Sequence, residues 1–411
     1  MLIVQKYGGT SVADAERILH VANRVVSRIK HGDQVAVVVS AMGNRTDELI
    51  DLATSISAEP DPRELDMLLS TGEQMSIALL AMALRSIGQE AVGLTGQQAG
   101  IYTRPQYGSG RIARVEVHRI QRELDAGRVP IIAGFQGITE DAEIVTLGRG
   151  ASDTTAVALA VALGADRCEN CKDVEGVLTA DPRIVPNARK LTDITYEEML
   201  ELSAQGSQVM HSRAVELASV YNLPIYVNSS MVDAPGTLIH SGENMEERNR
   251  VRGIAHDTDV AKITVRHVPD RPGIAANIFE PLAAANVSID TIVQNASEDD
   301  LTDLTFTLSE KDLARAEKLM VEICKEVGAR EFISDKDLGK VSIVGTGIQT
   351  APGYASRMFR ALFDAGINID LISTSEIRLT CLVHRDRVAD AVRALHDAFE
   401  LEKPGATVER A

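Results

Sequence analysis

The spacing of apolar residues along positions 1–240 switches repeatedly between the period of a strand and the period of a helix. Short apolar runs predict strands at 34–40, 128–133, 143–147, 166–171 and 224–228, after a first strand that begins at Leu2. Apolar positions three to four residues apart predict helices at 18–29, 65–86, 153–163, 196–202 and 213–221, the first of them capped by Ser11 and Asp14. This alternation favours an α/β layered domain with a largely parallel sheet.

The second half of the chain contains an internal repeat that follows a polar stretch at 241–250, which we interpret as a linker. Pro272-Gly273 returns as Pro352-Gly353, and Ile289-Asp290 returns as Ile369-Asp370, both 80 residues later. Each copy has the pattern of a strand, a Pro-Gly loop, an amphipathic helix and a second strand. The copies contain no nucleophile–base pair and no phosphate loop, so we expect them to bind a small zwitterion rather than to catalyse.

Composition and charge narrow the classes of partner. The chain has 411 residues, 45% hydrophobic, a formal net charge of −17, 3% aromatic residues and no Trp. This acidity disfavours nucleic acids and anionic membranes, and an anionic substrate would need a local cationic pocket. No apolar run approaches the roughly 18 residues of a membrane span. A strand pattern begins at once, so we expect no signal peptide and a cytoplasmic protein of two or three domains.

Four cysteines are present, and two of them, Cys168 and Cys171, form a C-x-x-C at the end of a predicted strand. A zinc site would need two more ligands at suitable spacing, and a redox pair would favour a helix N-terminus. We therefore interpret the pair as reduced thiols and expect no metal site built by the protein.

The first strand ends in a cation and two glycines, Lys6, Gly8 and Gly9, directly before a predicted helix. Glycines let backbone N–H groups approach a phosphate, and a helix N-terminus is electropositive. The pattern is no Walker loop, because G-x-x-x-x-G-K-[ST] is absent. It therefore indicates either a phosphate-binding turn or an ordinary turn with a solvated lysine.

Other segments carry residue types suited to chemistry. Ser40 to Asp47 follows a buried strand, where α/β proteins commonly bind ligands. Glu73 is suited to an ammonium or a hydroxyl, or is simply solvated. Arg149, between two glycines, is suited to a carboxylate, while Ser152 and Asp153 open a helix as ligand contacts or only as its caps. The loop 172–183 has polar groups that suit a ribose and phosphates, or is a solvated turn.

In order, these segments resemble the aspartate kinases of the amino-acid kinase superfamily over nearly the whole chain. The motifs are 6–11, 39–43, 72–73, 147–150, 152–156 and 180–183, and the repeat resembles a pair of ACT domains through 268–273, 293–295 and 373–377. The resemblance implies a three-layer α/β sandwich with a mainly parallel central sheet, followed by two ferredoxin-like ACT domains. It places a catalytic domain at 1–240, a linker at 241–258, ACT domains at 259–337 and 338–402, and a tail at 403–411.

The resemblance implies that ATP, with Mg²⁺, phosphorylates the β-carboxylate of L-aspartate in the first step of lysine, threonine and methionine biosynthesis. It assigns Lys6 and Asp153 to catalysis. It assigns substrate binding to Thr46, Glu73, Arg149, Gly150 and Ser152. It assigns ATP binding to Lys6, Tyr7, Gly8, Gly9, Ser40, Lys172, Asp173, Thr179, Asp181, Arg183 and Gln208.

The resemblance also implies feedback regulation by lysine, threonine or both, bound by the ACT pair between subunits of a homo-oligomer. The residues expected to contact an effector are Asp270, Gly273, Ser288, Asp290, Gln294 and Asn295. A shorter regulatory chain is a further expected partner. The alternative is that the repeats serve only dimerisation.

Several positions depart from the family pattern, and the departures cluster on the nucleotide side. The family usually has a third glycine where Ala151 stands, a threonine where Lys172 stands and a phosphate-contacting lysine where Gln208 stands. It also commonly has an aromatic residue, a proline and an arginine at positions 171, 212 and 228, where this chain has Cys171, Ser212 and Asn228. Three hypotheses follow, in this order: an aspartate kinase with a modified ATP site, a weak or silent amino-acid sensor, and a kinase for another acidic amino acid or nucleotide.

Overall fold

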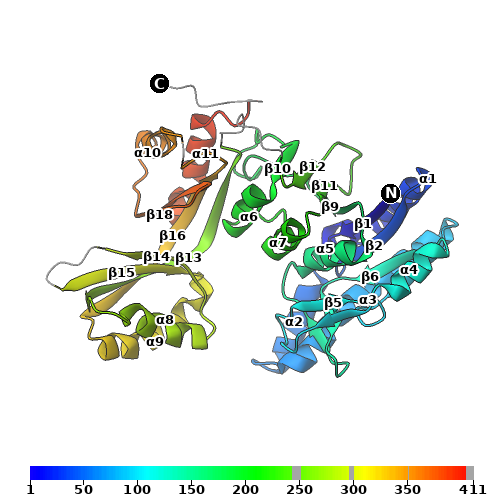
Figure 1. Cartoon of the computed structure of the whole chain (residues 1–411), viewed down its shortest axis with the longest axis horizontal. Coiled ribbons are helices and arrows are strands. Elements are labelled where there is room, and N and C mark those ends of the chain that lie inside the picture. The colour runs from blue at the N-terminus through cyan, green and yellow to red at the C-terminus, as the bar shows by residue number, and fades with distance from the viewer. Residues whose placement is uncertain (243–250, 296–299, 350, 404–411) are drawn as a thin grey trace. The chain divides into compact units, whose positions relative to one another are not determined.

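The computed structural model describes residues 1–242, 251–295, 300–349 and 351–403 (Figure 1). These residues form two compact units. The first unit comprises residues 1–178, 190–204 and 208–242, and the second unit comprises residues 179–189, 205–207 and 251–403. Two short segments within the span of the first unit, 179–189 and 205–207, therefore belong to the second unit.

An eight-stranded sheet forms the centre of the first unit. Its order is β10 (Asp193–Thr195), β12 (Thr237–His240), β11 (Ile225–Ser229), β9 (Arg167–Lys172), β1 (Leu2–Tyr7), β2 (Gln34–Val39), β6 (Val129–Ala133) and β3 (Ala91–Leu94). The strands from β11 to β3 run parallel, and only the pairing of β11 with β12 is antiparallel. The predicted parallel-rich α/β sheet is confirmed.

Helices cover both faces of this sheet and make the three layers. On one face, α1 (Ala15–Lys30) and α3 (Pro62–Ser86) share a core with alternate residues of β1 and β2 that includes Tyr7. On the other face lies α5 (Ala151–Leu163), which receives Lys6 because successive strand residues point to opposite faces. The remaining helices are α2 (Arg45–Ile56), α4 (His118–Asp125), α6 (Tyr196–Ala204) and α7 (Ser212–Val220).

Two local features of the first unit differ from the sequence interpretation. Ser11 lies in a 3-10 turn, η1 (Gly9–Val12), so α1 is capped by Asp14 alone, whose carboxylate accepts from Arg17 N at 2.9 Å. A second sheet also forms, in the order β5 (Ile112–Val115), β4 (Ile101–Thr103), β7 (Gln136–Ile138) and β8 (Ile144–Thr146). The prediction of a strand at 143–147 matches β8, whereas β4, β5 and β7 are three or four residues long, too short for a clear period-2 signal.

Helix α3 is long and apolar enough, by length and composition, to cross a membrane. Half of its most apolar window is buried within the structure, and its buried positions include polar Asp66 and Glu73. This burial pattern is that of a core helix of the first unit.

The second unit is built on one antiparallel six-stranded sheet. Its order is β14 (Ile289–Gln294), β15 (Leu301–Leu308), β13 (Gly253–Pro269), β16 (Glu331–Val344), β18 (Arg378–His384) and β17 (Leu371–Thr374). The first repeat contributes α8 (Ile274–Ala284) and α9 (Glu310–Val327), which lie side by side along the sheet (Figure 1). The second repeat contributes α10 (Tyr354–Asp364) and α11 (Val388–Ala398).

Strand β13 belongs to both repeats. Residues 261–269 pair with β15 of the first repeat, whereas residues 253–257 pair with 340–344 of β16, in the second repeat. A register shift between Asp257 and Val260 separates the two halves. Residues 253–258, predicted as linker, are therefore strand, and the first repeat is inserted within the second. The polar run Asp257-Thr258-Asp259 hides this strand in the sequence pattern.

The segment 179–189 is packed into the second repeat. Ala180 and Val185 are buried in its hydrophobic core, and Ile254 N donates to the carbonyl of Thr179 at 2.8 Å. The hydroxyl of Thr179 lies 3.0 Å from Nε2 of His396 on α11 and accepts from Arg189 N at 2.9 Å. Residues 179–189 thus follow directly after a loop of the first unit in the sequence but pack into the second unit.

Candidate active site

The carboxyl ends of three adjacent parallel strands bring the predicted site residues together. Tyr7, the last residue of β1, pairs with Val39 of β2 and with Cys171 of β9. Lys6, Ser40 and Lys172 therefore lie at one edge of the sheet, where α/β proteins bind ligands. The N-terminus of α5 faces the same edge and supplies Asp153.

Two lysines converge on the carboxylate of Asp153. Lys6 Nζ lies 2.7 Å from Oδ1, and Lys172 Nζ lies 3.5 Å from Oδ2. The backbone N–H of His211 also donates to Oδ2, at 3.3 Å. Burial by itself would raise the pKa of Asp153, but the charges of Lys172 and Lys6 outweigh burial and hold that pKa well below its usual range. Asp153 is thus an anion that positions cations and is no proton acceptor.

The glycine turn after β1 is packed too tightly for a side chain at one position. A Cβ on Gly9 would lie 2.7 Å from the carbonyl oxygen of Ala41 and 2.9 Å from that of Gly43. A hydrogen bond from Gly43 N to Gly9 O, at 3.0 Å, joins the same two segments of backbone. The β1 turn and the loop after β2 therefore form one rigid backbone surface beside Lys6.

Glu73 lies in α3 and is 2% exposed, so the solvated alternative is wrong. Its Oε1 accepts from Ala41 N at 3.0 Å, whereas Oε2 has no hydrogen-bond partner among the described residues. Burial raises the pKa of Glu73 to about 7, against the opposing effect of backbone hydrogen bonds. A buried carboxylate oxygen without a partner is a strong acceptor for a ligand ammonium.

The other predicted substrate residues surround the start of α5 and α2. Arg149 is an exposed side chain whose guanidinium pairs with Asp47 at 2.7 Å, in the turn that also holds half-buried Thr46. Gly150 has a φ of +75° at the N-cap of α5, and Ser152 is buried. These residues fit a role in substrate binding. In this structure the carboxylate of Asp47 pairs with the Arg149 guanidinium, which we predict binds a carboxylate of the substrate.

Ala151 does not crowd the site. Its methyl group packs in a small apolar cluster with Leu69, Phe135 and Leu147. The side chain thus points into the protein core, and the glycine that the family usually carries there is not required for space.

The residues predicted to bind nucleotide are only partly brought together. Gly8, Ser40 and Lys172 lie at the sheet edge, while Asp173 and Gln208 are exposed. Tyr7 is fully buried on the α1 face, opposite Lys6, so its phenol is a core group, and burial raises its pKa. A contact of ATP with Tyr7 would therefore use its backbone, and ATP binding at this position stays a prediction.

The remaining nucleotide residues belong to the second unit. Thr179 is completely buried, and its hydroxyl is used by Arg189 N and His396, so it has no free surface for a ligand. Asp181 and Arg183 pair with each other at 2.7 Å. The polar residues that suggested one ligand loop at 172–183 gave no sign that the chain passes from the first unit to the second after Leu178. Nucleotide binding by Asp181 and Arg183 stays a prediction.

One residue of the site was missed by the sequence analysis. Asn170 pairs in register with Lys6 on the neighbouring strand, and it is buried. Its Oδ1 has no hydrogen-bond partner among the described residues, while its Nδ2 lies 2.7 Å from Met210 Sδ. The available signal was an amide side chain in the middle of an otherwise buried strand.

The predicted effector residues lie in the first repeat. Asp270, Gly273, Ser288, Gln294 and Asn295 are exposed. Asp290 instead forms an ion pair with Lys340 and accepts from the Thr307 hydroxyl at 3.2 Å, and although burial alone would raise its pKa, these contacts lower it. A matching ion pair joins Asp370 of the second repeat to Lys262 of the first, as Asp290 of the first repeat is joined to Lys340 of the second.

No cluster of three or more His, Cys, Asp or Glu side chains suited to a metal occurs within the part of the chain that the structure describes. All four cysteines are free and buried, and Cys168 and Cys171 point to opposite faces of β9 because they are three residues apart. This agrees with the interpretation of reduced thiols.

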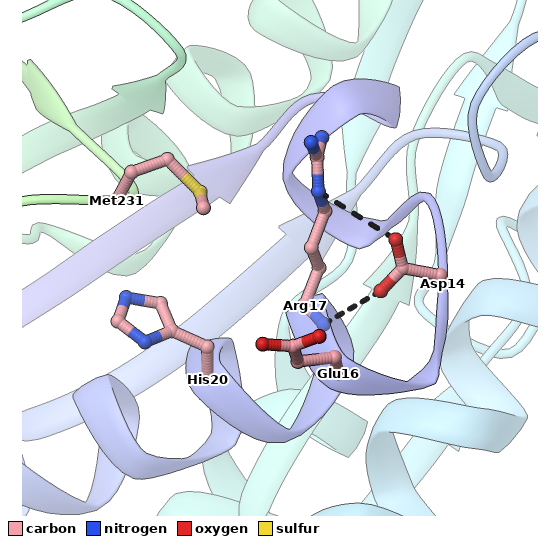
Figure 2. A pocket seen from close by; sticks show the side chains of 5 residues that line it. All are labelled: Asp14, Glu16, Arg17, His20 and Met231. Atoms are coloured by element: carbon pink, nitrogen blue, oxygen red, sulfur yellow. Dashed lines mark hydrogen bonds and ion pairs between the residues drawn. The ribbon is translucent and has the colours of Figure 1, made fainter.

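A cavity of about 330 Å³ lies beside the N-terminus of α1. Its lining comprises Asp14, Glu16, Arg17, His20 and Met231 (Figure 2). Asp14 and Arg17 are neighbours in the lining and form an ion pair with each other (Figure 2). It belongs to the α1 face of the sheet, whereas Lys6 faces α5, so it is not part of the candidate site.

Comparison with known proteins gives consistent matches over the full length. The amino acid kinase family model matches residues 1–229, and ACT domain models match residues 263–324 and 341–399. An aspartate kinase of Stutzerimonas stutzeri (strain A1501) is 51% identical over 410 residues, which cover 99% of this chain and 100% of that protein.

Two crystal structures of E. coli aspartokinase III are also similar. The complex with aspartate and ADP, described as the R-state, has 26% identity and a TM-score of 0.83 over 97% of this chain and 100% of that one. The complex with lysine and aspartate, described as the T-state, has 25% identity and a TM-score of 0.71 over 96% of this chain and 99% of that one.

Proposed function

The chain belongs to the aspartate kinases of the amino acid kinase family, and from this premise we propose that it transfers the γ-phosphoryl group of ATP to the β-carboxylate of L-aspartate. One observation carries the proposal at the level of the site. Ala41 packs against Gly9 of the glycine turn with its carbonyl and donates its N–H to Glu73. The glycine turn proposed to bind phosphate and the carboxylate proposed to bind the substrate ammonium therefore both contact the backbone of the same residue, Ala41.

The chemistry needs positioning and charge, with no covalent enzyme intermediate. A β-carboxylate oxygen attacks the γ-phosphorus, an O–P bond forms, and the bond to the β–γ bridging oxygen breaks as ADP leaves. The attacking carboxylate is already ionised, so no base must remove a proton. Lys6 stabilises negative charge on the transferring group, and Asp153 holds Lys6 in place through its 2.7 Å ion pair.

The substrate side binds the other groups of aspartate. Glu73 accepts the α-ammonium with its unpartnered Oε2. The α-carboxylate of aspartate replaces the carboxylate of Asp47 on the guanidinium of Arg149. The hydroxyl groups of Thr46 and Ser152 add hydrogen bonds to the substrate. Three separate elements thus fix the acceptor before transfer, which lowers the entropic part of the barrier.

Mg²⁺, bound to the phosphates of the nucleotide, would supply positive charge at this site. It prefers oxygen ligands and keeps several waters, and it is commonly held by substrate phosphates. Asp153 is the carboxylate at this edge, and its oxygens are already approached by Lys6 and Lys172. The donor set therefore fits a magnesium ion that phosphates hold and that neutralises their charge.

Regulation by an amino acid at the second unit is part of the proposal. The E. coli aspartokinase III complex with lysine supports an amino-acid effector, which we propose to be lysine or threonine. A homo-oligomer joined through the repeats and a location in the cytoplasm are further parts of the proposal. A shorter regulatory chain stays a further proposal. Asp270→Ala should abolish inhibition by the effector, and unchanged sensitivity would instead favour repeats that serve only dimerisation.

The test of the proposed function is an ADP-release assay with MgATP and L-aspartate, in which hydroxylamine traps the acyl phosphate. Aspartate-dependent ADP with matching hydroxamate is expected, and Lys6→Met should lose it. The same assay with L-glutamate in place of L-aspartate tests whether the chain phosphorylates another acidic amino acid. Absence of turnover in the intact chain would refute the kinase, even where aspartate still raised the melting temperature.

A further inference from the structure

The turn that carries Arg149 has little rigidity of its own. Arg149 lies between Gly148 and Gly150, whose φ angles are +86° and +75°. Glycine adopts positive and negative φ about equally well, so it leaves the backbone free to take many conformations. The Arg149 side chain is 73% exposed, so burial contributes little to fixing it. An arginine that is to bind a substrate carboxylate needs a defined position, which the surrounding elements must therefore supply.

Asp66, on α3, holds the chain immediately before this turn. It is 1% exposed. Its Oδ2 accepts from the backbone N–H of Thr146 and from that of Gly108, both at 2.9 Å, and its Oδ1 accepts from the Thr146 hydroxyl at 2.6 Å. Hydrogen bonds to a carboxylate are stronger than those to a neutral acceptor. One buried carboxylate thus fixes the end of β8 and joins it to the loop 104–111, between β4 and β5.

Arg213, on α7, holds the start of the turn to the same loop. Its Nη1 donates to the carbonyl of Leu147 at 2.8 Å, and its Nη2 donates to the carbonyl of Gly110 at 3.0 Å. Both bonds come from one planar guanidinium, so they set the spacing of the two carbonyls. The loop also packs closely on β8, because a Cβ on Gly110 would lie 2.5 Å from Cγ1 of Val145. Two segments that are distant in sequence are thereby joined beside Arg149.

Helix α3 connects this arrangement to the proposed ammonium site. Asp66 and Glu73 are both buried residues of α3. They are seven residues apart, which is about two helical turns, so they lie on the same face of the helix. At a rise of 1.5 Å per residue, their positions are about 10 Å apart along its axis. One rigid helix therefore sets where the turn of Arg149 lies relative to the carboxylate of Glu73.

We propose that Asp66 and Arg213 are positioning residues for aspartate binding, which hold the turn of Arg149 and the loop 104–111 in one arrangement so that the Arg149 guanidinium meets the α-carboxylate of the substrate. This inference rests on the proposed kinase function and deepens it on the acceptor side. In this role neither side chain touches the substrate, since Asp66 accepts from backbone and hydroxyl donors and Arg213 donates to carbonyls. Their effect is therefore exerted through Arg149.

The test measures KM for aspartate and KM for ATP in the full chain, together with binding of aspartate alone by calorimetry. Asp66→Leu and Arg213→Met should each raise KM for aspartate and weaken aspartate binding by about 10- to 100-fold, with KM for ATP within about twofold. Asp66→Asn should recover most of the binding. Its amide oxygen accepts from the two N–H groups, and its amide nitrogen donates to the Thr146 hydroxyl.

A matched control removes a similar contact elsewhere in the first unit. Arg85 Nε donates to the carbonyl of Ala91 at 3.0 Å, at the far end of α3. Arg85→Met should therefore leave both KM values unchanged, even where it lowers the melting temperature. An increase in KM for aspartate in Arg85→Met equal to that in Arg213→Met would show a general effect of lost stability and overturn the inference.

A double-mutant cycle shows whether Arg213 acts through Arg149. Arg149→Ala alone should raise KM for aspartate, because the substrate carboxylate loses its partner. Adding Arg213→Met to Arg149→Ala should then raise that KM by no more than about twofold further, since the group that Arg213 positions is already absent. Effects of the two substitutions that multiply in full would contradict a positioning role.

The outcomes also separate this inference from the proposed function. If Asp66→Leu does not fold, because it leaves buried donors unpaired, Arg213→Met on a half-buried side chain carries the same prediction. Unchanged KM for aspartate in the folded variants, with turnover intact, would keep the kinase and refute the inference. Aspartate binding that depends on both residues, in a chain without turnover, would keep the inference and refute the kinase. A chain that bound no aspartate would overturn both.

Discussion

Replacing Glu73 by glutamine should stabilise the chain at alkaline pH while removing aspartate binding. The carboxyl group is buried, one oxygen accepts from Ala41 N, and the other has no partner within the described residues. Burial raises its pKa from 4.5 to about 7. Glutamine keeps an acceptor for the Ala41 N–H but has no charge to desolvate, so the folded state no longer bears that cost.

The magnitude follows from proton linkage. Between these pKa values the folded chain keeps the proton of Glu73 and the unfolded chain releases it, so stability falls as pH rises from about 4.5 to 7. The ionised carboxyl then costs about 3 kcal/mol at pH 8 and about 1 kcal/mol at pH 5. The stability advantage of Glu73→Gln should therefore grow by about 2 kcal/mol between pH 5 and pH 8.

Urea unfolding of both proteins, followed by circular dichroism at pH 5, 6.5 and 8, measures this gap. Glu123→Gln is a control of opposite sign. Burial would raise the pKa of Glu123, but hydrogen bonds from Arg128 and Arg119 outweigh burial and lower it, so this variant should destabilise the chain by an amount that is constant from pH 5 to 8. A gap between Glu73→Gln and the unmodified chain that does not change with pH would refute the reasoning.

Four further predictions follow from packing and exposure. Gly9→Ala should cost about 1–3 kcal/mol in a urea titration and abolish activity, whereas Gly8→Ala, whose Cβ would meet only Lys6 Nζ at 3.6 Å, should leave stability within about 0.5 kcal/mol. Asp47→Asn should lower KM for aspartate by up to about fivefold by releasing Arg149, and a higher KM would contradict the exchange. Thr179→Val should destabilise the second unit by about 1–2 kcal/mol, seen as a lower melting temperature, because it leaves buried groups unpaired. None of the four cysteines should react with a thiol reagent until denaturant is added, since all are buried, and fast labelling of the native chain would disprove their placement.

Much of the first unit could be predicted because its elements are long and periodic. The strands and helices around Lys6, Asp153 and the glycine turn occur where apolar spacing placed them, within about three residues. The convergence of Lys6, Ser40 and Lys172 could be expected from the rule that parallel strands end at one edge, whereas Asp153 comes from a helix that follows a strand of the second sheet. The side on which Tyr7 lies follows from alternation with Lys6, a simple consequence of strand geometry that motif matching overlooks.

The rest depends on tertiary contacts that local patterns do not record. The burial of Glu73 comes from packing of α3 against the loop after β2, and nothing in the sequence around it distinguishes a buried from a solvated carboxylate. The split membership of β13 depends on pairing with β16, which lies some 80 residues further along the chain. The capture of 179–189 by the second repeat depends on side chains such as His396, which are further still in sequence.

The insertion of one repeat in the other has a consequence for any attempt to exchange regulatory modules between relatives. A cut in the polar stretch before β13 would keep the six-stranded sheet whole, but the transplanted module would arrive without Ala180 and Val185, which complete its core. The donor would leave those two side chains behind on a loop with nothing apolar to cover them. A working chimera therefore requires the exchange of three segments, 179–189, 205–207 and the chain from β13 onward, so that the recipient's own loop is replaced together with the module it supports.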